Sequence, residues 1–467
     1  MIRELREAAP SCCLQLHNTI RPHRQAGIAL LLLVFVLGIV AASTLYASLD
    51  TAGIRIAREN ATQQALHTAK QALIAYSSNS LTAGTCTTNC PRPGDLPCPD
   101  TSNSGNAGTS CGSAAGSNQS LRIGRLPWKT LGIEDLRDGY GERLWYAISN
   151  NFKNNTRALP LNSDTVGTIS IRDASGALIY DTAAGNGVAA VVFSPGPAIQ
   201  RQDGVNQARS TTQENTVSNY LDNALGEDNA DFVDSSSTNG FILGPVYDSQ
   251  GREILNDRLI LLTRDDMVTA MEQRVAQEAR NALLDYYCGS ASNANYSTRS
   301  CLSASGNRFY PSPAQFNDNS CLGNSNISSG CDSHNSESRG KIPANNLSPD
   351  WSSTSILRGT KNNNWFQQNG WRELVFYAVA PACGTGYIDC NGGGGLLTLN
   401  SALESSSTKQ AIVITAGRSI GTQSRTSTSA KQSEVNYLDG ENYSPLDNVY
   451  VRANTSSDFN DRALSIP

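Results

Sequence analysis

The sequence has few ionisable side chains, and histidine is the scarcest of them. Charged residues make up 16% of the chain, against about a quarter in typical globular domains. The four histidines are His17, His23, His67 and His334. The formal net charge is −5, and no basic run occurs beyond the N-terminal segment. Nucleic acid is therefore not an expected partner, and the supply of acid–base groups for catalysis is small.

The sequence motifs of common enzyme classes are missing as well. There is no Walker loop, no dinucleotide-binding motif and no Gly-x-Ser-x-Gly elbow. The acid pairs Glu134/Asp135 and Glu227/Asp228 would suit a glycosidase only if two carboxylates faced each other at a fixed gap. His67 is expected on a helix and His334 in a polar loop. We therefore predict a non-enzymatic protein without a cofactor.

A long apolar run is present near the N-terminus. It extends from Ile28 to Leu49 without a charged residue, and as a helix it would cover roughly 33 Å, enough for a bilayer core. Basic side chains at 21–24 precede it, so the positive-inside rule places residues 1–27 in the cytoplasm and the body outside. The sequence thus predicts a cytoplasmic leader at 1–27 and a transmembrane helix at 28–49 in contact with membrane lipid. A cleaved secretory signal is the alternative.

Helical periodicity continues after this run. Alanines recur at three- and four-residue spacing together with Leu66, Leu73 and Tyr76, and neither Gly nor Pro interrupts Ile54 to Ser77. The simplest structure is a single helix of about 50 residues, half in lipid and half packed against the body.

This arrangement resembles the type IV pilins and the type II secretion pseudopilins. A short basic leader ends in His-Arg-Gln-Ala-Gly at Gly27, an apolar helix starts at Ile28, and an amphipathic extension leads to a globular head. The resemblance covers residues 20–78. It implies cleavage after Gly27 by a prepilin peptidase, packing of the helix among other pilin-like subunits, and a location in the bacterial inner membrane with the body in the periplasm or at the cell surface. The family's glutamate at the fifth mature position is Leu32 here, as in the large minor pseudopilin at the tip. An uncleaved anchor is the alternative.

The body contains an internal duplication. A series of sequence blocks recurs in the same order, namely 72–76 with 282–286, 125–128 with 341–343, 141–148 with 370–379, 189–196 with 410–417, 219–222 with 436–439, and 255–261 with 459–465.

Each copy is predicted to contain one helix, a Cys- and Pro-rich irregular stretch and several strands. Short β-branched or aromatic runs bounded by Gly, Pro or Asn occur at 143–148, 188–193, 258–262, 374–379 and 411–415. In the second copy, four-residue spacing from Met267 to Leu283 predicts a helix that begins at Asp265-Asp266. The predicted fold is α+β. It has the long N-terminal helix, a first unit at 50–264 with helix extension 54–77, and a second unit at 265–467, each a helix on an antiparallel sheet as in pilin heads.

Cysteines outside the predicted leader are even in number in each unit, which predicts disulfide bonds and an oxidising compartment. Four cysteines allow three connectivities in the first unit, so its pairing is a preference. Zinc would need thiolates at spacings such as Cys-x2-Cys, from which Cys86-x3-Cys90 departs. Pairing between sequence neighbours gives Cys86–Cys90, Cys98–Cys111, Cys288–Cys301, Cys321–Cys331 and Cys383–Cys390.

One loop has the spacing of a calcium site. Asp100, Ser102 and Ser104 alternate ahead of Gly105. Only Asp100 is charged, whereas calcium takes six to eight oxygens with several carboxylates among them. A turn closed by Cys98–Cys111 is therefore expected, with a weak calcium site as the alternative.

These observations lead to one hypothesis and one alternative. The chain is expected to be a non-enzymatic, membrane-anchored, pilin- or pseudopilin-like envelope protein, a minor or tip component of a type IV pilus or type II secretion assembly. The alternative is an anchored periplasmic or surface ectodomain that binds or hydrolyses cell-wall glycans.

Overall fold

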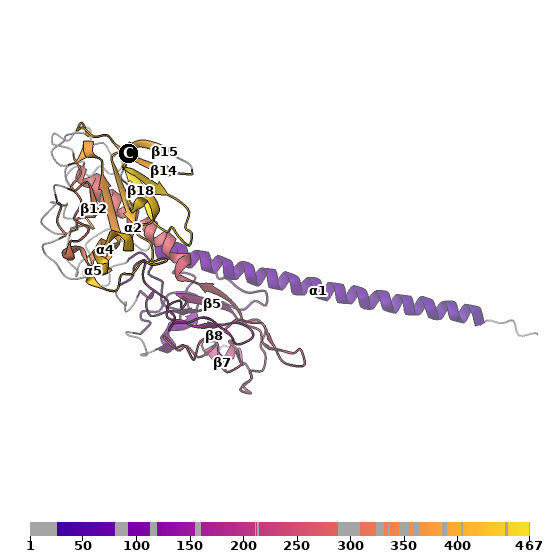
Figure 1. The fold of residues 1–467 in the computed structure, drawn as a ribbon. Helices are drawn as coiled ribbons and strands as arrows, with labels where there is room; N and C mark the ends of the chain where they lie inside the picture. The colour runs from indigo at the N-terminus through magenta and orange to yellow at the C-terminus, as the bar shows by residue number, and fades with distance from the viewer. Residues whose placement is uncertain are drawn as a thin grey trace, which may run out of the picture. The chain divides into compact units, whose positions relative to one another are not determined.

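Two four-stranded antiparallel sheets with the same strand order form the framework of residues 58–467 (Figure 1). The structure is a computed structural model. The unit Met1–Ala57 contains the first part of helix α1 (Ala26–Asn79), and the unit Arg58–Pro467 contains all the sheets. The described residues are 26–79, 92–112, 119–154, 160–210, 212, 214–287, 309–323, 331–334, 337–344, 351, 355–358, 364–384, 390–402, 405–443 and 447–466.

The two large sheets match in order and in register. The first has the order β1-β2-β5-β11 and the second β12-β13-β16-β18. Ser194 pairs with Arg258 in the first sheet as Thr415 pairs with Arg462 in the second. The strands are β1 (Ile123–Arg125), β2 (Trp145–Ile148), β5 (Ala190–Ser194), β11 (Arg258–Leu262), β12 (Arg339–Lys341), β13 (Val375–Val379), β16 (Ala411–Thr415) and β18 (Arg462–Ile466).

A smaller sheet accompanies each large one, again with matching topology. In the first, β3 pairs antiparallel with β4 and parallel with β8, and in the second β14 pairs antiparallel with β15 and parallel with β17. Two further strand pairs, β6–β7 and β9–β10, lie in the first half of the body. The bounds are β3 (Ile171–Arg172), β4 (Leu178–Tyr180), β6 (Asn223–Ala224), β7 (Glu227–Asp228), β8 (Phe241–Ile242), β9 (Val246–Tyr247), β10 (Glu253–Leu255), β14 (Leu397–Ser401), β15 (Ser405–Lys409) and β17 (Val449–Arg452).

This correspondence is the one expected of an internal duplication. We call residues 58–264 the first repeat and residues 265–467 the second repeat. The predicted strands at 258–262 and 411–415 have the predicted bounds, and those at 143–148, 188–193 and 374–379 differ by one or two residues at their ends. All five runs are short and mostly apolar, and the strands in four of them are buried along their whole length, whereas β11 is mostly half-buried.

Helix α2 (Arg264–Tyr287) packs against β16 and β18. Its start is stabilised by Asp266, whose Oδ2 accepts hydrogen bonds from the backbone N and Oγ1 of Thr263 at 2.8 and 2.7 Å. Met271, Val275 and Leu283 are fully buried, as the periodicity predicted. The described residues also form the short helices α3 (Trp365–Gln368), α4 (Trp371–Leu374) and α5 (Thr428–Lys431).

The repeats share one hydrophobic core. A single cluster of buried side chains includes Leu66 and Leu73 of α1, Met271 of α2, and residues of both large sheets. Across the two helices, Lys70 Nζ lies 2.8 Å from Asp266 Oδ1. The boundary near 264/265 is therefore a boundary between repeats that are packed together.

Two predictions about the N-terminus are wrong. Crossing a bilayer takes about 20 predominantly apolar residues in one helix, and among the described residues no helix combines the necessary length with the necessary apolar character. The transmembrane helix at 28–49 is accordingly not supported, and neither is the single-pass location in a bacterial inner membrane. Helix α1 is long, and its described large apolar side chains between Leu32 and Val40 are exposed. The α+β class stands, with mostly small sheets.

Candidate functional site

Three of the predicted disulfide bonds are present in the described residues. They are Cys98–Cys111, Cys321–Cys331 and Cys383–Cys390, with Cα–Cα distances of 5.5, 4.6 and 4.0 Å. The cysteines of the two other predicted bonds, Cys86–Cys90 and Cys288–Cys301, lie outside the described residues.

The predicted processing site lies in the first turn of α1. Gly27 and Ile28 follow Ala26, where the helix begins. Residues 1–25 of the predicted leader lie outside the described part of the chain. Cleavage between Gly27 and Ile28 stays a prediction.

The loop at Asp100 is a turn whose carboxylate is already occupied. Asp100 Oδ1 accepts hydrogen bonds from the backbone N and Oγ of Ser102, both at 2.9 Å, and Oδ2 accepts one from the backbone N of Gly105 at 2.5 Å. Asp100 is buried, so its oxygens stabilise the turn and do not face a cation. Among the described residues, no group of three or more His, Cys, Asp or Glu side chains could hold a metal ion.

At least one acid of each pair considered for glycan hydrolysis is held by an arginine. Asp135 Oδ1 lies 3.0 Å from Arg143 Nε, and Glu227 Oε1 lies 2.6 Å from Arg172 Nε. Carboxylates held in this way lack the free geometry of a general acid. His67 is exposed on α1 and His334 is exposed in a loop, as expected.

A polar network links a loop to the central strands of the first repeat. Arg209 donates hydrogen bonds from Nε to the backbone oxygen of Asn219 at 3.2 Å and from Nη1 to that of Gly196 at 2.6 Å. Its guanidinium carbon lies 5.1 Å from the ring centre of Tyr220. One cation thus holds the Asn-Tyr-Leu-Asp segment against the end of β5.

The second repeat contains the same network. Arg425 donates from Nε to the backbone oxygen of Asn436 at 2.7 Å and from Nη1 to that of Gly417 at 2.9 Å, and it lies 4.5 Å from the ring centre of Tyr437. The two arginines were missed in the sequence. Their signal is a Gln-x-Arg segment that precedes Asn-Tyr-Leu-Asp in each copy.

A pair of buried carboxyl groups adjoins this network in each repeat. In the first, the backbone N of Asp222 donates to Asp257 Oδ2 at 2.9 Å, and the backbone N of Asn256 donates to Asp222 Oδ2 at 2.8 Å. Burial raises the pKa of Asp222 to about 6. Burial, with the neighbouring Asp222 carboxyl second, also raises the pKa of Asp257 well above its usual range.

Asp439 and Asp461 repeat the pair. The backbone N of Asp439 donates to Asp461 Oδ2 at 2.8 Å, and the backbone N of Asn460 donates to Asp439 Oδ2 at 2.8 Å. Burial raises the pKa of both carboxyl groups, and the Asp439 charge adds to the shift at Asp461. Because all four carboxyl groups are buried, their role is to fix the entry of the last strand of each sheet.

The two repeats differ at one acid next to the arginine. In the first, Glu142 Oε1 lies 3.2 Å from Arg209 Nη1. Strand register places Glu373 at the equivalent position, but Glu373 takes other partners. Its Oε1 accepts a hydrogen bond from Tyr437 Oη at 2.8 Å and lies 3.0 Å from Lys431 Nζ.

Arg425 is paired with the first repeat instead. Its Nη1 lies 2.9 Å from Asp164 Oδ1 and 3.1 Å from Oδ2. Glu373 and Arg425 are thus not paired with each other. Both line a pocket of about 500 Å³ that lies between the 160–166 loop and the second repeat. We call it the inter-repeat pocket, and its polar lining includes Asn162, Asp164, Thr165, Glu373, Arg425 and Lys431.

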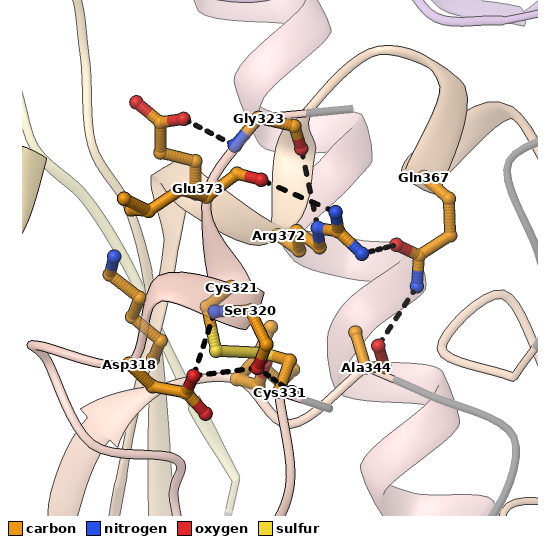
Figure 2. The surroundings of a disulfide bond; sticks show 12 residues. Asp318, Ser320, Cys321, Gly323, Cys331, Ala344, Gln367, Arg372 and Glu373 are labelled. Carbon is orange, nitrogen blue, oxygen red and sulfur yellow. Dashed lines mark hydrogen bonds between the residues drawn. A yellow bond between two sulfur atoms is a disulfide. The ribbon is translucent and has the colours of Figure 1, made fainter. Parts of the chain in front are cut away.

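Glu373 is held in position from the side of a disulfide bond. Figure 2 shows the backbone N of Gly323 donating to Glu373 Oε2, at 2.6 Å, while the backbone oxygen of Gly323 accepts from Arg372. Arg372 Nη1 in turn donates a hydrogen bond to Gln367 Oε1 at 3.2 Å. Because Cys321–Cys331 closes the segment that leads to Gly323, it also orders this wall of the pocket.

The chain matched no protein-family model, no curated protein and no solved structure.

Proposed function

We propose that the chain is a non-enzymatic, pilin- or pseudopilin-like subunit, a minor or tip component that joins its assembly through α1 and displays the duplicated head. One observation carries this proposal, the apolar surface of α1 between Leu32 and Val40. Leu33, Phe35 and Leu37 are 58%, 67% and 58% exposed. Successive helical positions point in different directions, so this surface surrounds the helix and requires cover on all sides.

Helices of neighbouring subunits would provide that cover. Burial of one such side chain contributes about 1.5–3 kcal/mol, so contact along two turns of α1 would hold subunits together. The resemblance of residues 20–78 to pilins supports helices as the partners. The non-catalytic assignment rests on three carboxylates of the head, Asp135, Glu227 and Glu373, each of which is paired with an arginine or a lysine.

Photo-crosslinking in the native host tests the proposal. A photoreactive side chain at Phe35 should crosslink to an apolar helix that follows a Gly-ending leader, in this chain or in another pilin-like subunit. The matched control is Gln64, which is exposed on α1 within the head and should give no such product. Introducing Leu33→Asp and Leu37→Asp together should abolish the crosslink. Crosslinks from Phe35 only to proteins without such a helix would contradict the proposal.

A further inference from the structure

We propose that the inter-repeat pocket binds a neutral, hydroxyl-rich ligand of the size of one or two sugar residues. This goes beyond the proposed assembly role of α1, because it concerns the head alone. The pocket's volume, about 500 Å³, lies within the range of roughly 300–1,000 Å³ that is typical of small-molecule sites.

The charges that line the pocket select for a neutral ligand. Asp164 is paired with Arg425 at 2.9 Å, and Glu373 is paired with Lys431 at 3.0 Å. Two anions and two cations leave no net charge, so a charged ligand gains little Coulomb energy. The Asp164 side chain, 38% exposed, still offers lone pairs on its carboxylate, and the Lys431 side chain, 31% exposed, still offers N–H donors.

Hydroxyl groups match this mixture of donors and acceptors. Each hydroxyl can donate to a carboxylate and accept from an ammonium or amide group at the same time, and hydrogen bonds to charged partners are the stronger ones. The side chains of Asn162 and Thr165 add further polar atoms to the lining. Arg425 also lines the pocket, and its Nη1 donates to Asp164 Oδ1 at 2.9 Å.

The acid that lines the pocket has different partners from the equivalent acid in the first repeat. There the equivalent acid, Glu142, pairs directly with Arg209. In the second repeat Arg425 pairs with Asp164, and Glu373 pairs with Lys431. Hydrogen bonds from Gly323 and Tyr437 hold Glu373 in place. The acid is thus fixed before a ligand arrives, which lowers the entropic cost of binding.

Ligand-detected NMR and calorimetry on the full chain test the inference. The probes are glucose, galactose, mannose, N-acetylglucosamine and maltose, with glucuronate as the anionic comparison. We expect millimolar binding of at least one neutral sugar. Lys431→Met should weaken it about tenfold, the effect of losing one charge-assisted hydrogen bond.

Two further variants separate binding from folding. Glu373→Gln, which removes the ion pair that positions Lys431, should weaken binding, whereas Glu142→Gln, the matched change in the first repeat, should leave it unchanged. Lys431 is partly exposed, so its replacement does not threaten the fold if Glu373→Gln proves unstable. No binding of any neutral sugar, an unchanged affinity in Lys431→Met, or a preference for glucuronate would each overturn the inference.

Discussion

Arg425 of the second repeat donates a hydrogen bond from Nη1 to Oδ1 of Asp164 in the first repeat, at 2.9 Å. The arginine side chain is 5% exposed and the aspartate 38%. The pair therefore lies at the margin of the core, where water screens it only in part. It joins two copies of a duplicated unit that also meet through apolar side chains and through the Lys70–Asp266 ion pair.

We expect Asp164→Asn to destabilise the protein by about 1–2 kcal/mol, because a nearly buried guanidinium loses its carboxylate. Asp203→Asn is the control. Asp203 has similar exposure, 39%, but its partner Arg201 keeps a second carboxylate in Asp228. Urea unfolding should show the smaller effect for Asp203→Asn. Equal effects would show that the contact between repeats adds nothing.

The buried carboxyl pairs make stability depend on pH. The folded pKa of Asp222, about 6, and that of Asp257 both lie above the unfolded value, which is about 4. The folded state therefore holds protons more tightly, so this stabilisation is complete below about pH 4 and is lost as pH rises through the folded values. In Asp257→Asn an amide replaces the carboxyl group, and the loss of stability between pH 5 and pH 8 should be smaller. Unfolding midpoints measured between pH 5 and pH 8 give this loss of stability for both proteins. The same dependence on pH in Asp257→Asn as in the unmodified chain would contradict the prediction.

Local sequence patterns predicted individual strands and the buried face of α2. The strands at 258–262 and 411–415 and the buried stripe of α2 follow from periodicity and burial, and the matched strand orders follow from the repeated blocks. The same reasoning failed at 28–49, where the apolar run predicts a membrane span but no described helix has the length and apolar character for one.

The inter-repeat pocket had no local signal. Asp164 and Arg425 are separated by 261 positions, and neither belongs to a motif of known chemistry. The Gln-x-Arg segments could have been found by extending the Asn-Tyr-Leu-Asp comparison upstream. The different partners of Glu142 and Glu373 could not have been found from the sequence. Both acids occupy equivalent positions, and only the surrounding tertiary structure separates their roles.

Removing Cys321–Cys331 should cost about 2–3 kcal/mol, as expected for a loop of this length, whose sequence separation is 10. Replacing both cysteines by serine frees the segment that contains Gly323, whose backbone N donates a hydrogen bond to Glu373. Sugar binding should therefore weaken as well. Urea unfolding and calorimetry measure the two effects. The same change at Cys98 and Cys111 should lower stability without affecting binding.

Mature protein should begin at Ile28 if the leader is processed as in pilins. Gly27→Ala should block cleavage, because the family's peptidase cuts after glycine. Intact-mass measurement in a host that contains a prepilin peptidase distinguishes the two products. An intact leader in the unmodified chain would remove the pilin-like assignment while leaving the head unaffected.

Gly94 and Met271 provide the sharpest test of packing between the repeats. Gly94 has a φ of +94°, and a Cβ added there would lie 2.6 Å from Met271 Sδ and 2.9 Å from Leu161 Cδ2. Gly94→Ala should therefore combine backbone strain of about 1–2 kcal/mol with overpacking of about 1–3 kcal/mol. Gly132→Ala is the control, since Gly132 has a φ of +70° and nothing within 4 Å of the added carbon. It should show the strain alone. Adding Met271→Ala to Gly94→Ala should recover part of the overpacking term in a double-mutant cycle of unfolding free energies. If the two losses simply add, Met271 does not press on this turn, and the shared core between the repeats is looser than the structure indicates.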